Sequence, residues 1–258
     1  MRGWSIGVIA DLLGRSDTYE FNRLLHEHTS YSQVAVFTDF GQSSYTRDNY
    51  QDSETRFETE SQRVGICIDC VKEDIESLGF PYWRRDHRYV EVCAKHNTIL
   101  LRQCPICRHD IRYHRQGYGH DLLWGGCKGS YVHQCEPTKN PHEYKLTFAR
   151  IFAEIGESKF AVDLESAIEH LACQANKMAM EGSISEEELM AINWRLKNSK
   201  GISDTWLKYR PDDRYSHNII EVIAMLYGSF AAVVDSLRET DKLVRNIDDL
   251  MRVEYQDR

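Results

Sequence analysis

The chain has 258 residues, a net charge of −8, 41% hydrophobic residues and 28% charged residues. This composition is typical of a globular protein of one large or two modest domains, and it excludes a disordered, collagen-like or repeat chain. The longest apolar stretch, 219–234, is interrupted by Glu221 and is shorter than the ~20 residues that cross a bilayer. The first residues lack the pattern of a secretory signal. The sequence therefore favours a cytoplasmic protein without a membrane span.

The charges are unevenly distributed along the chain. Residues 63–128 contain 11 Lys and Arg against 8 Asp and Glu, together with five of the 11 histidines, whereas residues 181–258 contain 11 Lys and Arg against 15 Asp and Glu. Because phosphate groups attract cations, we expect any contact with nucleic acid to be local and confined to residues 63–128.

The N-terminal region is predicted to begin with helices and to end in a linker. Residues 4–13 and 17–28 follow helical periodicity, with Ser16 or Asp17 as the N-cap of the second helix. Residues 41–62 are polar and follow neither the helical nor the strand period, which is typical of an exposed linker. We therefore expect residues 1–62 to form an N-terminal helical segment and a polar linker.

Cysteines dominate the next region. Seven of the eight cysteines lie between positions 67 and 135. Two Cys-x-x-Cys pairs and one Cys-x-x-His pair have the turn spacing that directs two ligands at one tetrahedral metal ion. A disulfide framework is the alternative, and the missing secretory signal disfavours it. The sequence predicts two zinc ions per chain, one bound by Cys67, Cys70, Cys93 and His96 and the other by Cys104, Cys107, Cys127 and Cys135.

The second ligand set leaves an alternative open. Cys127 and Cys135 are separated by seven residues, and His109 or His133 could replace one of them. A site with four protein ligands stabilises a fold that a loop-rich segment could not otherwise maintain. We therefore expect residues 63–137 to form a tandem zinc-finger module with short β-hairpins. Cys173 is expected to be a small buried apolar residue on a helix.

Further residues of this module follow a family pattern. The sequence runs from Cys67-x-x-Cys70 and Asp74 through Gly79-Phe80-Pro81-Tyr82-Trp83-Arg84-Arg85-Asp86-His87 to Cys93-x-x-His96, Leu100 and Cys104-x-x-Cys107. It closely resembles the TniQ/TnsD family of transposon target-selection proteins, and a weaker similarity reaches residues 6–10 and 26–29. The resemblance covers about residues 6–107. The chain departs from the family pattern in the last ligand pair, which lacks the usual two-residue spacing.

The resemblance implies a function as well as a fold. It implies a non-enzymatic, DNA-binding adaptor for transposition that recognises a target, either DNA or a CRISPR RNA-guided complex, and recruits an AAA+ ATPase. A homodimer is compatible with this role. Aromatic and basic side chains alternate within residues 82–88, and such a run can stack on bases and hold phosphates. The predicted nucleic-acid or partner contact residues are Arg84, Arg85, His87 and Arg88, whereas Trp83 is expected to pack inside the finger.

The C-terminal region, 138–258, is predicted to be α-helical. Ser185 and Glu188 form a predicted capping box at the start of one helix. Residues 185–210 fit either a DNA-binding helix-turn-helix or an ordinary antiparallel helix pair, and we favour the pair because the region is acidic. The apolar stripe of residues 219–237 is expected to be core, with a dimer or ATPase-docking surface as the alternative. Helical periodicity covers 144–155, 163–179, 185–198, 203–209, 217–237 and 239–251.

The expected fold class is thus mainly α-helical with a central two-zinc, loop-rich finger module. We expect no enzymatic activity, because the sequence lacks a phosphate-binding loop, a dinucleotide fingerprint and a His-Glu-x-x-His motif. Two alternatives remain. One is a zinc-ribbon DNA-binding transcriptional regulator. The other is a zinc-supported, Mg-dependent nuclease that would use residues among Arg108, His109, Asp110, His114, His120 and Asp121.

Overall fold

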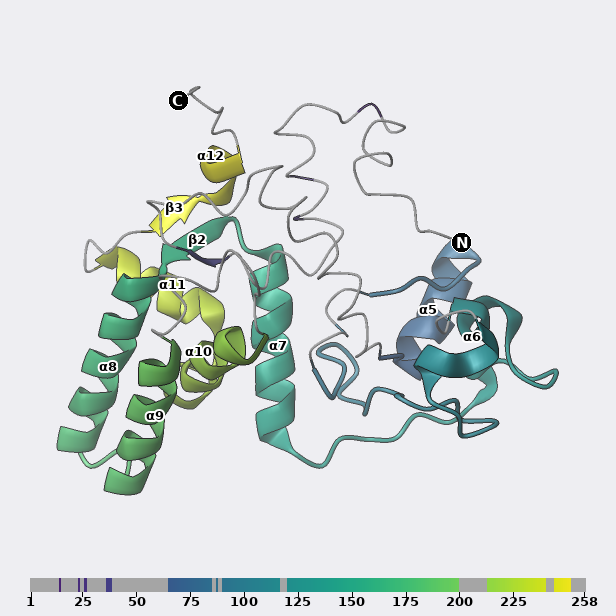
Figure 1. Cartoon of the computed structure of the whole chain (residues 1–258), viewed down its shortest axis with the longest axis horizontal. Helices are drawn as coiled ribbons and strands as arrows, with labels where there is room; N and C mark the ends of the chain where they lie inside the picture. The colour runs from purple at the N-terminus through teal and green to yellow at the C-terminus, as the bar shows by residue number, and fades with distance from the viewer. Residues whose placement is uncertain are drawn as a thin grey trace. The chain divides into compact units, whose positions relative to one another are not determined.

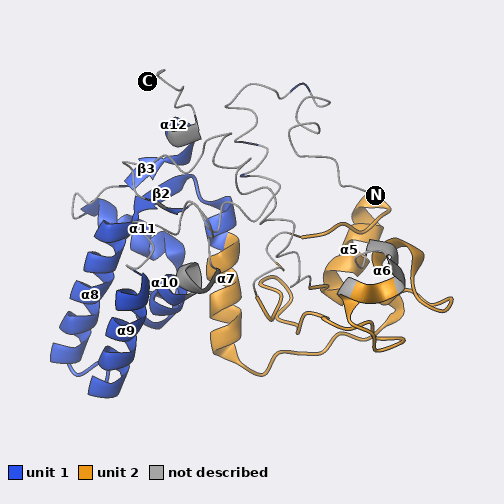
Figure 2. Ribbon diagram, in the orientation of Figure 1, with its two compact units in different colours: residues 1–57, 154–258 blue, residues 58–153 orange. Residues whose placement is uncertain are grey.

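The chain divides into two compact units. One contains residues 1–57 and 154–258 and the other contains residues 58–153, as Figure 2 shows in two colours. The predicted linker 41–62 and helix 203–209 lie outside the described residues, as do helices 4–13 and 17–28 apart from residues 23 and 26. The computed structural model of the chain describes residues 14, 23, 26, 36–38, 65–84, 87, 90–116, 120–199, 213–239 and 244–251.

The unit of residues 58–153, here called the zinc unit, has short elements and a small core. Its elements are α5 (Ile68–Leu78), the 3₁₀ helices η3 (Ile111–Gln116) and η4 (Val132–Gln134), α6 (His120–Gly125) and most of α7 (Glu143–Glu157). Nine buried side chains form one hydrophobic cluster among the described residues of this unit, and two of them are cysteines. The cluster contains Ile66, Ile68, Val71, Cys104, Ile111, Leu122, Leu123, Cys127 and Val132.

Helix α5 was not predicted from the sequence. Cys67 is its N-cap residue, and its thiol accepts a hydrogen bond from the Cys70 amide at 3.5 Å. Gly79 ends the helix in the left-handed region at φ 82°, where its amide donates to the carbonyl of Ile75 at 3.1 Å. The Cys-x-x-Cys pair is thus the first turn of a helix, because the thiol replaces the usual oxygen acceptor of an N-cap.

The second unit, here called the helical unit, combines helices with a small sheet (Figure 1). Strand β1 (Phe37–Thr38) runs parallel to β2 (Phe160–Asp163), and β3 (Val244–Asn246) pairs with β2 in the antiparallel direction. The helices include the end of α7 together with α8 (Leu164–Met180), α9 (Glu186–Ser199), α10 (Asp213–Leu226), α11 (Phe230–Glu239) and α12 (Ile247–Met251). The mainly helical fold class is confirmed.

Two predicted helices are wrong in part. Residues 217–237 form two helices, because Gly228 adopts φ 69° and its amide bonds the carbonyl of Ile223, which ends α10. Residues 239–251 contain β3 before α12, because backbone pairing with β2 outweighs the local helical pattern. The apolar stripe of α10 and α11 is core as predicted, with Phe230 edge-on to Phe37 at a ring distance of 5.8 Å.

The helical unit offers no single membrane-spanning candidate within its described part. No described helix is long and apolar enough to cross a bilayer. Residues 218–226 and 230–239 meet this criterion only when taken together, and they are bent by 81° at the break between them.

The predicted capping box of α9 is confirmed, whereas the predicted burial of Cys173 on α8 is wrong. The capping box of α9 is present, since the Ser185 amide donates to Glu188 Oε2 at 2.8 Å and the Glu188 amide donates to Ser185 Oγ at 3.2 Å. Cys173, however, is exposed and not buried. Leu171 and Ala175 lie on the buried face of α8, and Cys173 between them points to the opposite side of the helix.

The start of α11 depends on a carboxylate from α7. Glu154 Oε2 accepts hydrogen bonds from the Ser229 hydroxyl at 3.1 Å and from the amides of Phe230 at 2.6 Å and Ala231 at 3.4 Å. Glu154→Ala leaves these donors without their acceptor, so we expect a loss of about 1–2 kcal/mol in unfolding free energy, measured by urea denaturation. Glu157→Ala, an exposed neighbour, is the control. Equal stabilities of the two variants would contradict the cap.

Candidate metal centres

The first cluster has the geometry of a tetrahedral zinc site. The Nδ1 atom of His96 lies 3.5 Å from Cys67 Sγ, 3.3 Å from Cys70 Sγ and 3.6 Å from Cys93 Sγ. The Cys70 and Cys93 sulfurs are 3.6 Å apart. A tetrahedron with Zn–S bonds of about 2.3 Å and a Zn–N bond of about 2.0 Å separates its sulfurs by about 3.8 Å and each sulfur from the nitrogen by about 3.5 Å. The four ligand atoms therefore match a Cys₃His zinc site, and the sulfurs are too far apart for a disulfide.

The thiols of this cluster also favour a cation electrostatically. Hydrogen bonds from the Cys70 and Cys93 side chains lower the pKa of Cys67 below its ordinary value. Their hydrogen bonds to Cys67 raise the pKa of Cys70 and raise that of Cys93 to about 11. One thiolate thus forms readily, and its negative charge opposes the next two. A divalent cation offsets this repulsion and allows all three cysteines to bind as thiolates.

His96 is oriented by a carboxylate outside the ligand set. Its Nε2 atom lies 2.9 Å from Glu73 Oε1, while Nδ1 faces the three sulfurs. The other Glu73 oxygen accepts a hydrogen bond from Lys95. Zinc-bound histidines usually donate their second N–H to such a carboxylate, which determines the ring orientation and the tautomer. Glu73 therefore completes the first site, and its helix position two turns after Cys67 brings it there.

Two ligand pairs are presented by the same backbone fold, repeated after eleven residues. In the first knuckle, residues 92–99, the Cys93 amide donates to the Thr98 carbonyl and the Asn97 amide to the Cys93 carbonyl. In the second knuckle, residues 103–110, the corresponding bonds run from Cys104 to His109 and from Arg108 to Cys104. The residue after each second ligand is left-handed, at φ 51° and 66°. These knuckles are the short β-hairpins expected from the sequence.

The second cluster contains Cys104, Cys107, His114 and Cys127. Their ligand atoms all lie within 4.8 Å of one another, and Cys107 alone of the four is half-buried rather than buried. A hydrogen bond from the His109 backbone lowers the pKa of Cys107 to about 6. His114 is 3% exposed, and its Nδ1 atom is buried with no hydrogen-bond partner in the described part of the chain. One imidazole nitrogen of His114 is the ligand atom that the cluster offers to a metal ion, and burial of this polar ring is costly unless its nitrogens have partners.

His114 stands where the sequence predicted Cys135. The Cys135 Sγ atom lies outside the cluster, 3.9 Å from the Tyr131 carbonyl oxygen, and its side chain packs against the hydrophobic core. Neither His109 nor His133, the predicted substitutes, joins the cluster. The reason is local: Ile111–Gln116 coils into η3, which turns His114 inward, whereas η4 ends at Gln134 and leaves Cys135 at its C-cap. The only sequence signal for His114 was its residue type, because it lies outside the short ligand spacings.

A two-residue turn positions Cys127 in the second cluster. The amides and carbonyls of Cys127 and Ser130 are mutually hydrogen-bonded, and Lys128 and Gly129 between them adopt φ 49° and 82°. Positive φ at both central residues is the signature of a type I′ hairpin turn. Gly126, at φ 64°, admits no side chain, since a Cβ atom there would lie 2.3 Å from the Ser130 carbonyl oxygen. The sequence Gly-Gly-Cys-Lys-Gly therefore shapes this ligand loop.

The predicted contact residues face inward where they are described. Arg84 Nη2 lies 2.6 Å from Asp74 Oδ1, and the guanidinium is 4.7 Å from the Tyr82 ring centroid. His87 is 3% exposed. Arg84 is thus half-buried in an ion pair and His87 is buried, whereas Arg85 and Arg88 lie outside the described residues, so their contact role stays a prediction.

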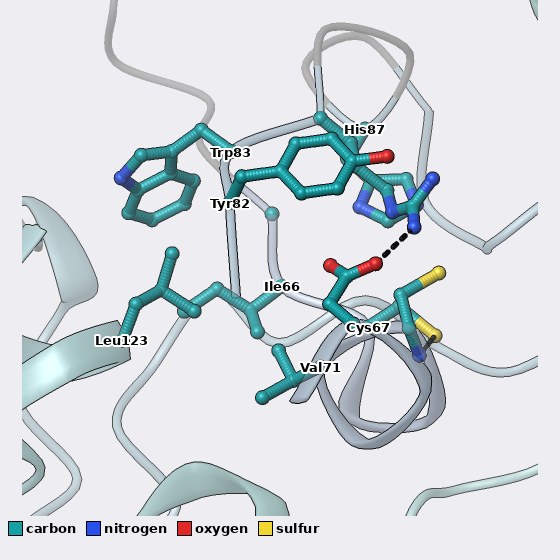
Figure 3. A pocket seen from close by; sticks show the side chains of 11 residues that line it. Ile66, Cys67, Val71, Tyr82, Trp83, His87 and Leu123 are labelled. Atoms are coloured by element: carbon teal, nitrogen blue, oxygen red, sulfur yellow. Dashed lines mark hydrogen bonds and ion pairs between the residues drawn. The ribbon is translucent and has the colours of Figure 1, made fainter. Parts of the chain in front are cut away.

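Figure 3 shows these side chains around a small cavity beside the first site, with Trp83 near Ile66 and Leu123. The cavity measures about 10 Å³, the room for about one water molecule. Trp83 packs against the hydrophobic cluster as predicted. The described residues between Cys70 and Cys93 therefore pack beside the first site. The cavity among them is too small for a substrate.

The nuclease alternative loses one of its residues in this arrangement. His114 belongs to the second metal cluster. His109 is exposed on the second knuckle and Asp110 pairs with Gln103 across it, while the side chains of His120 and Asp121 lie outside the described ones. The described geometry thus favours a structural role for His114.

Comparison with known proteins returns no match: no family model, no curated protein and no solved structure corresponds to the chain. The metal clusters therefore carry the functional argument. The protein has two Cys₃His clusters suited to zinc, in place of the predicted Cys₃His and Cys₄ pair.

Metal content distinguishes His114 from Cys135 as the fourth ligand of the second site. We expect two zinc ions per chain by elemental analysis, one in His114→Ala and two in Cys135→Ser. The opposite order, with zinc lost from the Cys135 variant and retained in the His114 variant, would restore the predicted Cys₄ set.

Substitution of Glu73 tests the first site separately from the second. Glu73→Gln removes the charge that orients His96, so we expect its zinc affinity to fall about 10- to 100-fold in competition with a chelator. Glu76→Gln, on an exposed position of the same helix, should leave the affinity unchanged. Equal affinities in both variants would mean that His96 needs no partner beyond the metal.

Proposed function

We propose that the protein is a zinc-stabilised, non-enzymatic adaptor of DNA transposition, which recognises a target site and recruits an AAA+ ATPase. The observation that carries this proposal is the pair of clusters in which protein side chains supply all four ligands. A catalytic zinc keeps one position open for water or substrate, whereas a four-ligand site is structural. Both clusters therefore support a role in binding rather than in chemistry.

The residues on which the resemblance to the TniQ/TnsD family rests contact one another where they are described. Asp74 of α5 forms an ion pair with Arg84 of the Tyr-Trp-Arg segment. Trp83 packs against the hydrophobic cluster, which includes residues of α5. The family-like residues between the ligand pairs thus form one connected set around the first zinc site. This is the behaviour expected of a structural motif, and it leaves target contact to other residues.

Exposed cations beside the second site are better placed for nucleic acid than Arg84. Arg108 directly follows Cys107 and Lys128 directly follows Cys127, so one metal would hold both tips near each other. Both side chains are exposed, and neither forms an ion pair with a described residue. Tyr113, next to His114, is 73% exposed and offers a ring for stacking. We therefore assign phosphate contact to Arg108 and Lys128.

Charge reversal at these tips tests the assignment. We expect the Arg108→Glu and Lys128→Glu double variant to bind a DNA duplex or an RNA at least tenfold more weakly than the unmodified protein, with a shallower dependence on salt, in fluorescence anisotropy titrations. The zinc content should stay at two ions. Lys139→Glu is the control, because Lys139 is an exposed cation whose backbone pairs with Thr98 of the first knuckle and not with the second site. Equal losses in the control and the double variant would refute a contact at the second site.

Recruitment is tested with purified components. We expect the protein to co-elute with its cognate AAA+ transposition ATPase, and to hold that ATPase on target DNA in size-exclusion chromatography. The Arg108 and Lys128 variant should retain the ATPase and lose the DNA. Magnesium-dependent DNA cleavage without ATPase binding would overturn the adaptor and favour the nuclease. DNA binding with neither activity would favour the transcriptional regulator.

A further inference from the structure

Helix α9 has apolar side chains on two opposite faces. Ile192 and Leu196 are buried in the helical unit, where α9 packs against α8 and α10. Met190 and Trp194, four residues apart, lie on the opposite face and are 60% and 63% exposed. A large exposed aromatic residue beside an exposed methionine is characteristic of the centre of a protein interface.

The charges at the ends of this outer face are of opposite sign. Exposed Glu186 and Glu187 lie one turn before Met190, and exposed Lys197 lies about one turn after Trp194. At 100° per residue, all five side chains project from the same side of the helix. The outer face of α9 is therefore acidic at its N-terminal end, apolar in the middle and basic at its C-terminal end.

Such a face is complementary to itself when two copies meet in opposite directions. The midpoint between Met190 and Trp194 nearly coincides with the midpoint between the acidic pair and Lys197. A two-fold axis at that level sets Met190 of each copy against Trp194 of the other, and the glutamates of each copy against the other's lysine. No comparable pairing arises in the parallel arrangement, in which like charges meet.

We propose that the protein forms a symmetric homodimer through the outer face of α9, with the two helices antiparallel. The contact is isologous and closes after two copies. Trp194 and Met190 supply the apolar centre, and the two Glu–Lys contacts at the ends determine the direction. This dimer is independent of the transposition role, since it uses only residues of the helical unit.

Sedimentation of the full zinc-loaded chain tests the dimer. We expect a concentration-dependent monomer–dimer equilibrium by analytical ultracentrifugation, with Trp194→Ala raising the dimer dissociation constant at least tenfold. The exposed Trp124→Ala is the matched control and should dimerise normally. A monomer at all concentrations, or equal effects of the two tryptophan variants, would overturn the proposal.

Charge exchange tests the antiparallel direction. The triple variant Glu186→Lys, Glu187→Lys and Lys197→Glu exchanges the charges of the two ends within one chain, so it should dimerise with itself as the unmodified chain does. It should form no heterodimer with the unmodified chain, because every antiparallel end contact would then join like charges, whereas parallel helices would join opposite ones. Circular dichroism and zinc content monitor folding of the variant. A heterodimer in the mixture, or a triple variant that stays monomeric, would contradict antiparallel pairing through these residues.

Discussion

Two clusters of three cysteines and one histidine, each able to hold a metal ion, are the constraint on which the zinc unit depends. The described hydrophobic cluster beside the second site contains nine buried side chains, and two of them, Cys104 and Cys127, also belong to the second metal cluster. A core of this size offsets little of the conformational entropy lost by loop-rich chain. A metal ion bound in each cluster would supply the missing free energy, because the four ligands come together only in the folded state. The first cluster joins α5 to the first knuckle, and the second joins the second knuckle to η3 and the Cys127 hairpin.

The sequence predicted those parts of the sites that depend on local geometry. Cys67, Cys70, Cys93 and His96 were found because a two-residue spacing itself directs both ligands to one point. His114 was missed because its place in the cluster depends on η3, a short 3₁₀ helix that begins at the buried Ile111 and has no clear sequence pattern. The helices α7, α8 and α9 were predicted from periodicity and differ from prediction by at most two residues at either end. The sheet was missed because strands of two to four residues carry no readable alternation.

The two units offer contact surfaces of different chemistry. Arg108 and Lys128 are exposed cations at turn tips, and the phosphate contact proposed for the zinc unit rests on them. The outer face of α9 has an apolar centre between opposite charges, which suits a protein surface. The proposed division would let one chain hold a target through one unit and an assembly partner through the other. It would also account for the uneven charge of the sequence, with its basic excess limited to residues 63–128.

X-ray absorption spectroscopy at the zinc edge tests the central claim most directly, because it counts ligand types averaged over both sites. Two Cys₃His centres predict an average of three sulfurs at about 2.3 Å and one nitrogen at about 2.0 Å for each zinc, with no bound water. A Cys₄ second site would raise the average to 3.5 sulfurs and lower the nitrogen to 0.5. That result, or an oxygen ligand that reveals an open catalytic position, would contradict two structural Cys₃His centres.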